Sequence, residues 1–261
     1  MKKKLIFLDM DGTLIDHAKN EIPASTKEAV KQLKEAGHVC AIATGRCPSL
    51  LYGFDKQLDI DHIIASNGRY VRVGNQILHH QTMPETRVKA LTRVLEDHHI
   101  GMAFQTAEVY TAKALFGDAH ILFAQHYNEE VPQVTEEFDH YDRVLQMIIY
   151  TKDPLPKVIM DEFADFTFTK SCAFGYDATM GEGMKEVGVK RLRDWLGFKF
   201  EDTIAIGDGM NDISMFEHVA TSIAMGNALP KVQSAATMIT QSVDQDGIFK
   251  AFETLGMIKR V

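Results

Sequence analysis

Two aspartates, Asp9 and Asp11, follow a short run of apolar residues near the start of the chain. The run, residues 5–8, has the composition of a fully buried strand, and the Gly12-Thr13 pair after the aspartates predicts a turn. The two carboxylates are therefore expected at the carboxyl end of a strand, where open α/β sheets bind ligands. Carboxylates this close repel each other, so such a site needs a cation or a proton shared between them. The arrangement suits a carboxylate nucleophile beside a general acid and base.

Two simpler structures fit the same spacing, namely a polar turn after a buried strand and half of a calcium-binding loop. A calcium loop requires a bidentate Glu at its twelfth position. Counted from Asp9, that position holds Asn20, which excludes the calcium loop. The polar turn stays open on this motif alone.

Two further buried strands end in polar clusters. The strand expected at 39–43 is followed by Thr44-Gly45-Arg46, and the strand at 203–206 is followed by Gly-Asp-Gly-Met-Asn-Asp at 207–212. Each cluster alone could be a turn or a capped loop. The carboxyl ends of parallel strands lie at one edge of a sheet, so the three clusters together predict a shared crevice.

The elements that must position these residues follow two patterns. Strands and helices alternate at both ends of the chain, which predicts a doubly wound, Rossmann-like parallel sheet. Between them, paired strands with helices interspersed predict an α+β module with its own sheet. The expected domains are therefore a discontinuous core, 1–81 plus 184–261, and an inserted module, 82–183. The expected elements are helices at 25–36, 48–57, 85–98, 155–164, 184–196 and 228–235, a further helix between 212 and 220, a hairpin at 70–73 and 76–80, and strands at 62–66, 101–106, 109–113, 144–150, 166–169, 172–176, 220–224 and 237–240, with a closing helix.

With these motifs in place, the sequence resembles the haloacid dehalogenase superfamily, and within it the Cof-type sugar-phosphate phosphatases with a large type-IIB cap. The four matching motifs, in order, are Asp9-Met10-Asp11-Gly12-Thr13, Thr44-Gly45-Arg46, Lys185, and Gly207-Asp208-Gly209-Met210-Asn211-Asp212. The resemblance covers essentially the whole chain. It departs at the third motif, where the family usually has a glycine after the lysine and this chain has Glu186. Lys190 and Lys170 therefore compete with Lys185 for the role.

The resemblance implies a catalytic cycle through an aspartyl-phosphate. Asp9 would attack phosphorus, and Asp11 would protonate the leaving alcohol and then accept a proton from water. Mg²⁺ would be held by the side chains of Asp9 and Asp208 and by the backbone carbonyl of Asp11. Asp212 would be a further ligand or a support for the others.

The same resemblance implies how the phosphoryl group is bound. Thr44, Asn211 and the backbone amides of Met10 and Gly45 would hold its oxygens. Lys185 would offset the negative charge of phosphate and carboxylates. Arg46 could reach the substrate or pair with a nearby carboxylate, and both roles stay open. The inserted module would be a cap that closes over the crevice and selects the leaving group.

These features predict a Mg²⁺-dependent phosphatase for small soluble phosphometabolites, with sugar phosphates favoured. A phosphomutase of the phosphomannomutase type is the enzymatic alternative, and a non-catalytic sensor of phosphorylated ligands is a second one. A net charge of −8 without a long basic run argues against nucleic acid as a partner. The chain shows no signal-peptide core or membrane span, and its three cysteines show no metal or disulfide spacing. We expect a cytoplasmic monomer or weak homodimer.

Some residues near the motifs have simpler expected roles. Trp195, Met210, Met215 and Met225 are expected to pack in the interior. His120 and His126 are expected at the surface, and Asn67-Gly68 matches either a plain turn or an Asn-Gly pair that recurs in these enzymes.

Overall fold

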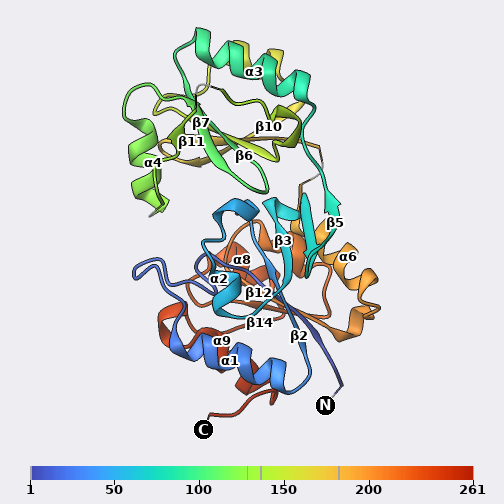
Figure 1. The fold of residues 1–261 in the computed structure, drawn as a ribbon. Helices are drawn as coiled ribbons and strands as arrows, with labels where there is room; N and C mark the ends of the chain where they lie inside the picture. Colours follow the sequence, from blue (N-terminus) through green and yellow to red (C-terminus); the bar gives the residue numbers. More distant parts are fainter. Residues whose placement is uncertain (1, 128, 136, 182, 261) are drawn as a thin grey trace. The chain divides into compact units, whose positions relative to one another are not determined.

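The computed structural model describes residues 2–127, 129–135, 137–181 and 183–260. The chain forms two compact units, labelled by element in Figure 1. The first unit comprises Met1–Arg46, Leu51–His80 and Met184–Val261, and the second comprises Cys47–Leu50 and Gln81–Gly183. The segment 47–50 was expected in the first domain and belongs with the second.

The first unit contains an eight-stranded sheet in the order β14-β13-β12-β1-β2-β3-β4-β5. Its strands are β1 (Leu5–Leu8), β2 (Val39–Ala43), β3 (His62–Ala65), β4 (Tyr70–Val73), β5 (Gln76–His80), β12 (Thr203–Gly207), β13 (Thr221–Ala224) and β14 (Met238–Ile239). All neighbours pair in parallel except the hairpin strands β4 and β5, which are antiparallel to their neighbours. Leu5 is level with both Val39 and Thr203, so β1, β2 and β12 run in step and end at one edge.

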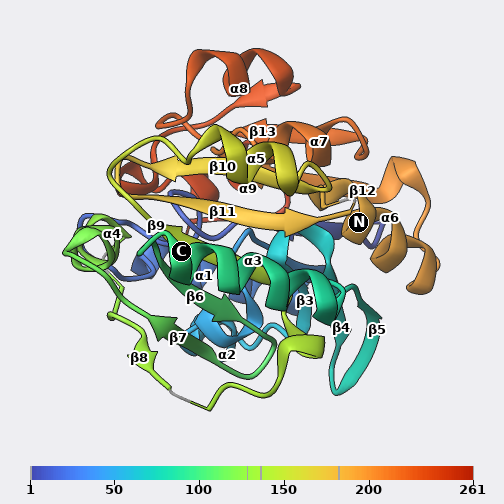
Figure 2. The ribbon, with the colours of Figure 1, turned by 90° about the horizontal axis from the view of Figure 1, so that it is seen from above.

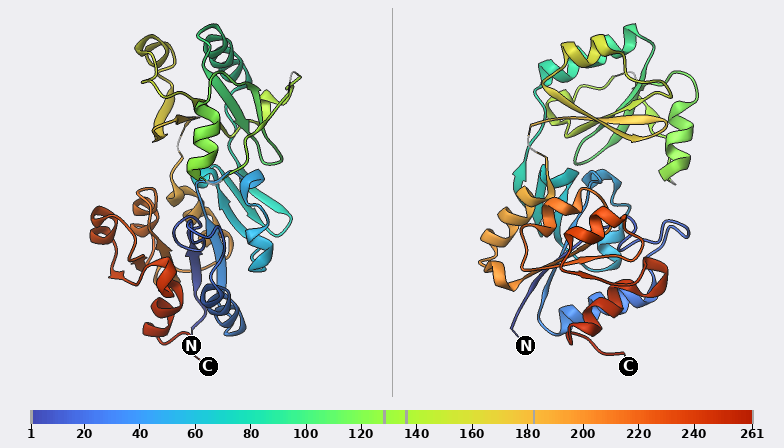
Figure 3. Two further views of the ribbon diagram at one scale, coloured as in Figure 1. Left: turned by 90° about the vertical axis from the view of Figure 1, so that its left-hand side faces the viewer. Right: turned by 180° about the vertical axis from the view of Figure 1, so that it is seen from behind.

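Helices cover both faces of this sheet, which explains why β1 is apolar at every position. Its four residues are fully buried. On one face, α6 (Lys185–Trp195), α7 (Asp212–Phe216) and α8 (Pro230–Ala235) contribute to the core around Phe7. The helices α1 (Ala24–Glu35) and α9 (Gly247–Thr254) pack against each other, as Figures 1 and 3 show from different sides. The short helix α2 (Phe54–Gln57) follows β2.

The second unit is built on a six-stranded sheet in the order β10-β11-β9-β6-β7-β8. Its strands are β6 (Gly101–Gln105), β7 (Tyr110–Ala114), β8 (Gln133–Val134), β9 (Gln146–Tyr150), β10 (Phe166–Cys172) and β11 (Gly175–Met180). The helices α3 (Glu85–Asp97) and α5 (Lys157–Glu162) pack on one face around Phe104 and Met147. Helix α4 (Ala119–Tyr127) packs on the other face, against Ile148 and Tyr150 (Figure 2).

Five short 3₁₀ segments complete the described elements: η1 (Pro48–Leu50), η2 (Ser66–Gly68), η3 (Tyr141–Arg143), η4 (Phe200–Asp202) and η5 (Val243–Gln245). The parallel α/β sheet joined to an α+β unit confirms the predicted fold class. None of the helices formed by the described residues is both long and apolar enough to span a lipid bilayer.

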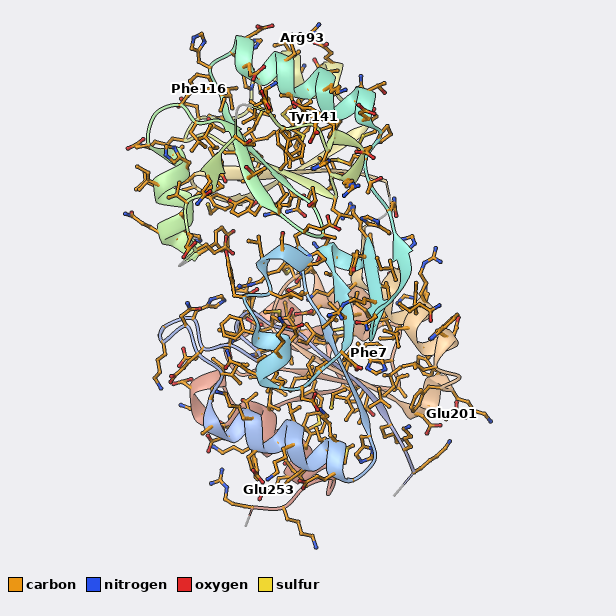
Figure 4. The ribbon with its side chains drawn as sticks, viewed as in Figure 1. Phe7, Arg93, Phe116, Tyr141, Glu201 and Glu253 are labelled. Atoms are coloured by element: carbon orange, nitrogen blue, oxygen red, sulfur yellow. The ribbon has the colours of Figure 1, made fainter. Side chains whose placement is uncertain are left out.

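Two expectations about side chains are wrong, and one helix was not anticipated. Trp195 is 55% exposed and Met210 is 47% exposed, whereas Met215 and Met225 are fully buried as predicted. Trp195 ends α6, beyond the last turn that faces the sheet, and Met210 lies in the loop after β12. Helix α4 lies between the strands expected at 109–113 and 144–150, where no element was expected. Figure 4 shows the buried Phe7 among the packed side chains of the first unit, and Glu201 and Glu253 at its periphery.

Candidate active site

The carboxyl ends of β1, β2 and β12 carry the three polar clusters identified in the sequence. The Asp9 amide continues the pairing of β1 with β12 by donating to the Ile206 carbonyl at 3.0 Å. This bond holds Asp9 level with the start of the segment 207–212. The Asp9 side chain is buried there, so its carboxylate depends on partners from the protein.

Lys185 supplies the principal partner. Its Nζ donates to Asp9 Oδ1 at 2.5 Å and to Asp212 Oδ1 at 2.6 Å, and its side chain is fully buried. The competing lysines lie elsewhere, since Lys190 pairs with Glu186 and Lys170 is exposed on β10. The structure therefore brings Lys185 to the carboxylates despite its unusual neighbour Glu186.

Two glycines let the start of α6 come close enough for this contact. A Cβ on Gly68 would lie 2.6 Å from the carbonyl oxygen of Met184, the residue before Lys185. A Cβ on Gly188 would lie 2.3 Å from Ile64 Cγ2. Both distances are below any real Cβ contact, so larger residues would push α6 away from the sheet and move Lys185.

Asp212 is fully buried and has both carboxylate oxygens engaged. Oδ1 accepts from Lys185, and Oδ2 accepts from the amides of Asp208 at 3.0 Å and Gly209 at 2.8 Å. A Cβ on Gly207 would lie 2.4 Å from the Asp212 carboxyl carbon, so the motif needs glycine at this position. Asp212 thus folds the loop after β12 back onto itself and orients Lys185.

Asp208 lies beside the first motif. Its Oδ1 accepts from the Thr13 hydroxyl at 2.7 Å, and its Oδ2 accepts from the Asn227 amide at 3.1 Å. Gly12 has a φ of +77°, and a Cβ there would lie 2.3 Å from Asp208 Oδ2. The glycine of the first motif is therefore required both by its left-handed backbone and by the closeness of this carboxylate.

Asn227 is a site residue that the sequence motifs did not reveal. Its Nδ2 also donates to the Gly12 carbonyl at 2.9 Å, and its Oδ1 accepts from the Val243 amide. It therefore ties the first motif to the loop after β13. Its position in the loop directly after β13, following Met225 and Gly226, is the signal that could have identified it.

Burial and mutual repulsion shift the ionisation of the cluster. Burial raises the pKa of Asp9 well above its usual range, Asp212 adds to the rise, and Lys185 opposes it. Burial lowers the pKa of Lys185, but Asp212 and Asp9 outweigh burial, so that pKa lies above its ordinary value. Burial also raises the pKa of Asp208 to about 6, against the hydrogen bond from Thr13. Lys185 thus offsets only part of the negative charge of the three carboxylates, and the site favours the binding of a further cation.

The donor set fits a divalent metal that prefers oxygen. Asp9, Asp208 and Asp212 each offer a carboxylate oxygen, and these atoms lie within 4.8 Å of one another. The Asp11 carbonyl accepts no backbone hydrogen bond among the described residues, so it is available as well. Hard oxygen ligands of this kind suit Mg²⁺. Asp9 keeps Oδ2 without a hydrogen bond from the described residues, whereas both carboxylate oxygens of Asp208 and of Asp212 accept hydrogen bonds within the protein.

Asp11 is held by Arg46 through two hydrogen bonds. Arg46 Nε donates to Asp11 Oδ2 at 2.9 Å, and a terminal nitrogen donates to Oδ1 at 2.6 Å. Of the two roles left open for Arg46, the structure shows the pairing with a nearby carboxylate. His17 Nε2 lies farther from the same Asp11 oxygen, at 3.9 Å.

Unpaired donors cluster at the ends of β1 and β2. The amides of Met10 and Gly45 donate to no partner in the part of the chain that the structure describes. The Thr44 hydroxyl is buried and accepts from the Arg46 amide at 3.0 Å, and its own proton has no acceptor among those residues. Neighbouring N–H and O–H donors at strand ends form a cradle for an anion.

Asn211 and Asn67 meet across the edge of the sheet. Asn211 Nδ2 donates to Asn67 Oδ1 at 2.9 Å, and a Cβ on Gly45 would lie 3.3 Å from that oxygen. Ser66 and Asn67 have φ values of 48° and 51°, which non-glycine residues rarely adopt. Asn67 therefore does more than form a turn, because this backbone directs its amide to the second and fourth motifs.

A parallel sheet with acids at its carboxyl edge, joined to an α+β unit by insertion, is shared by a known class of hydrolases. The model of the haloacid dehalogenase-like hydrolases matches residues 6–252, so the chain belongs to this family. The expected kinship with its Cof-type phosphatases of subclass IIB is confirmed.

Individual relatives place the chain within the family. YkrA of Bacillus subtilis (strain 168) is 34% identical over 99% of this chain and 100% of its own length. The pyridoxal phosphate phosphatase YbhA of Escherichia coli (strain K12) is 28% identical over 95% of this chain and 97% of its own. The subclass IIB sugar phosphatase BT4131 superposes with a TM-score of 0.82 at 29% identity, over 98% of this chain and 100% of its own. The protein is an enzyme, a phosphatase of the haloacid dehalogenase family.

Proposed function

We propose that this phosphatase hydrolyses monoesters of small hydroxylated metabolites with Mg²⁺, through an aspartyl-phosphate on Asp9. The observation that carries the proposal is the ion pair of Asp9 with a fully buried lysine at the carboxyl edge of the sheet. This pair fixes one carboxylate oxygen and leaves the other for attack on phosphorus. If Lys185 were an ordinary surface lysine and residues 9–13 only a polar turn, this buried ion pair would not be needed.

Asp9 and Asp208, with the Asp11 carbonyl, would hold the metal, and Asp212 would support them through Lys185 and the loop amides. When bound, Mg²⁺ neutralises carboxylate and phosphate charge and orients the phosphoryl group. Lys185 balances the remaining negative charge at the nucleophile. The amides of Met10 and Gly45, the Thr44 hydroxyl and the Asn211 amide would bind the equatorial phosphoryl oxygens.

Two displacements complete the reaction. In the first, Asp9 forms a bond to phosphorus while the ester oxygen leaves with a proton from Asp11. In the second, water attacks the aspartyl-phosphate, Asp11 takes the water proton, and Asp9 leaves as a carboxylate. The two hydrogen bonds from Arg46 hold the Asp11 carboxylate in one orientation, which positions it to take the water proton in the second step.

The test is release of inorganic phosphate from sugar, nucleotide and vitamin phosphates, with Mg²⁺ and with EDTA. We expect metal-dependent release from sugar phosphates above all, and a loss of at least about a thousandfold in kcat for Asp9→Asn. The Asp9→Asn variant should still fold and bind metal. Full activity of that variant would remove Asp9 as the nucleophile.

The same assay separates the alternatives. Phosphate exchange between hexose positions that requires a bisphosphorylated hexose, with little net release, would indicate a mutase instead. Binding of phosphate esters without turnover would indicate a sensor. Either result would replace the proposal of a hydrolase.

A further inference from the structure

The segment after β3 has a backbone conformation that its own contacts do not explain. Ser66 and Asn67 have φ values of 48° and 51°, and in the part of the chain that the structure describes no other two consecutive non-glycine residues have positive φ. The Ser66 side chain is fully buried, and its Oγ has no hydrogen-bond partner there. Backbone conformations of this kind cost free energy and cluster at binding and active sites. The segment is therefore a candidate for a role in the site.

Backbone hydrogen bonds hold this segment against the second motif. The amides of Ser66 and Asn67 donate to the carbonyls of Arg46 at 2.8 Å and of Thr44 at 3.1 Å. These two carbonyls flank Gly45 in the chain, so Asn67 is fixed beside that glycine. All of these residues belong to the first unit.

The Asn67 carboxamide lies over Gly45, together with that of Asn211. A Cβ on Gly45 would be 3.3 Å from Asn67 Oδ1, 3.4 Å from Asn67 Nδ2 and 3.5 Å from Asn211 Nδ2. Asn211 Nδ2 donates to Asn67 Oδ1 at 2.9 Å. Glycine at position 45 thus leaves room for two carboxamides directly beside a backbone amide of the anion cradle.

The hydrogen-bonding pattern determines which end of Asn67 remains for a ligand. The oxygen of a carboxamide accepts hydrogen bonds, whereas its nitrogen can only donate. Asn67 Oδ1 is engaged by Asn211, and Asn67 Nδ2 donates to none of the described residues. Asn67 is also partly exposed, so a ligand can reach it. Asn67 therefore offers a donor and calls for an acceptor.

The neighbouring groups select the kind of acceptor. The Gly45 amide and the Thr44 hydroxyl also have protons without acceptors among the described residues. A ligand hydroxyl placed among these donors would leave its own proton unpaired, at a cost in free energy. A phosphoryl oxygen only accepts, and its negative charge is favoured by a set of N–H and O–H donors.

We propose that Asn67 is a further phosphoryl-binding residue. Its Nδ2 would donate to the phosphoryl oxygen that the Gly45 amide also binds, while its Oδ1 keeps Asn211 in place. The inference rests on the proposed function and adds to it a residue outside the four motifs. It also gives the left-handed backbone of Ser66 and Asn67 a purpose, because that backbone holds the carboxamide at Gly45.

Two substitutions separate phosphoryl binding from mere support of Asn211. Both Asp and Gly tolerate a positive φ. Asn67→Asp keeps the size of the side chain and an oxygen that accepts from Asn211, but it replaces the donor by an anionic oxygen. Asn67→Gly removes the carboxamide without adding charge. Asn20 has the same φ of 51° in an exposed loop, so Asn20→Asp and Asn20→Gly are matched controls.

Phosphate release with Mg²⁺ from phenyl phosphate and from a sugar phosphate provides the first measurement. We expect Asn67→Gly to lower kcat/KM about tenfold or more, as for the loss of one hydrogen bond to a charged group. Asn67→Asp should lower it about a hundredfold or more, because a like charge then faces the phosphate. Both esters should lose by the same factor, since they share the phosphoryl group, and the Asn20 variants should match the wild type.

Two results of this assay would overturn the inference. If Asn67 only supported Asn211, Asn67→Asp would be nearly as active as the wild type and Asn67→Gly would be impaired. A loss confined to the sugar phosphate would assign Asn67 to the leaving group instead.

Binding of inorganic phosphate provides a readout that needs no turnover. In calorimetric titration with Mg²⁺ present, Asn67→Asp should bind phosphate at least about tenfold more weakly than the wild type. Thermal unfolding of the Asn67 variants checks that the fold is retained. Equal phosphate affinities would overturn the inference. Absence of phosphate release from every ester by the wild-type enzyme would instead overturn the proposed function, and the phosphate titration would still decide the role of Asn67.

Discussion

At the scale of single residues, Lys185 is the cation on which the acidic cluster depends. Lys185→Met would leave Asp9 and Asp212 buried without their shared partner. Removing one member of a buried ion pair typically costs about 3–5 kcal/mol, and we expect a loss of that order in metal-free protein at neutral pH. Urea unfolding measures it. Lys190→Met, which removes a partly exposed lysine of the same helix, should change the unfolding free energy by less than about 0.5 kcal/mol.

Equal stability of the two lysine variants would mean that the buried carboxylates take up protons instead of requiring the cation. In that case the loss of unfolding free energy in Lys185→Met would also not become smaller at lower pH, which urea unfolding at several pH values measures.

Arg46 controls the alignment of Asp11 and is predicted to matter for that reason. Arg46→Lys keeps the charge but cannot form the two parallel hydrogen bonds that hold the carboxylate. We expect kcat to fall about tenfold or more, with a smaller change in KM, because alignment affects the proton transfers. Steady-state kinetics on one sugar phosphate checks this split. A rise in KM alone would show that Arg46 binds substrate instead.

The pKa of Asp208 predicts how metal binding depends on pH. In the metal-free fold this pKa is raised to about 6, so Asp208 binds a proton below that pH and must release it to bind Mg²⁺. Metal affinity should therefore be constant above about pH 7 and fall as pH decreases through 6. The stability of the metal-free protein depends on pH in the opposite direction. Because the pKa of Asp208 is higher in the folded than in the unfolded state, lowering the pH from 7 towards 5 stabilises the fold through this group.

Calorimetric titration with Mg²⁺ at pH 7.5, 6.5 and 5.5 measures the effect. Asp208→Asn, measured in parallel, should bind Mg²⁺ weakly, and its affinity should not show the decrease through pH 6 that we attribute to Asp208. A wild-type affinity that does not vary with pH would contradict the assignment of Asp208 as a ligand.

At the scale of elements, the placement of α6 depends on close backbone contact at Gly68. Gly68 and Gly37 have nearly the same left-handed φ, +88° and +85°, but only Gly68 faces a close neighbour, the Met184 carbonyl. Gly37→Ala should therefore cost only the backbone strain, about 1 kcal/mol. Gly68→Ala should cost clearly more and should also reduce activity, because it displaces the start of α6 and with it Lys185.

Thermal unfolding and phosphate release from the two alanine variants provide the comparison. Similar stabilities and full activity in both would show that α6 adjusts to the added methyl group without moving Lys185.

The sequence predicted elements wherever periodicity and turn residues agreed. Strand β2 and the hairpin of β4 and β5 have the predicted bounds, because Gly37, Thr44 and Gly74-Asn75 mark their ends. Helix α4 was missed because its apolar residues 121–124 are consecutive and show no helical face. The exposure of Trp195 was also missed. Trp195 stands at helical spacing from the buried Leu192, which predicts burial, but the helix passes beyond the sheet at that turn.

The residues of the candidate site also divide into those that the sequence predicts and those that it does not. Motif residues at strand ends were predictable because parallel strands bring their ends together, as with Asp9 and Asp208. Contacts that depend on side-chain direction were not. The choice between two partners for Arg46 and the role of Asn227 required the positions of atoms on segments far apart in sequence.

At the scale of the whole molecule, the division into two units predicts that the first can fold alone. Its sheet and covering helices form their own core. We expect a chain in which a short flexible linker replaces residues 81–183 to unfold cooperatively, to bind Mg²⁺ and to retain slow hydrolysis of phenyl phosphate. Selectivity for sugar phosphates should be lost. Circular dichroism and Mg²⁺ titration check folding and binding, and failure to fold would show that the inserted unit is part of the core's stability.

The segment 47–50 has a consequence for recombining this family. Because it belongs with the second unit, the backbone passes between the units at four places instead of two. A chimera that exchanges only residues 81–183 with a relative would leave Cys47 and Ser49 facing a foreign carbonyl in place of that of Thr106. The transferable module is therefore a pair of segments, and natural variation at 47–50 is expected to track variation in the second unit more closely than in the first.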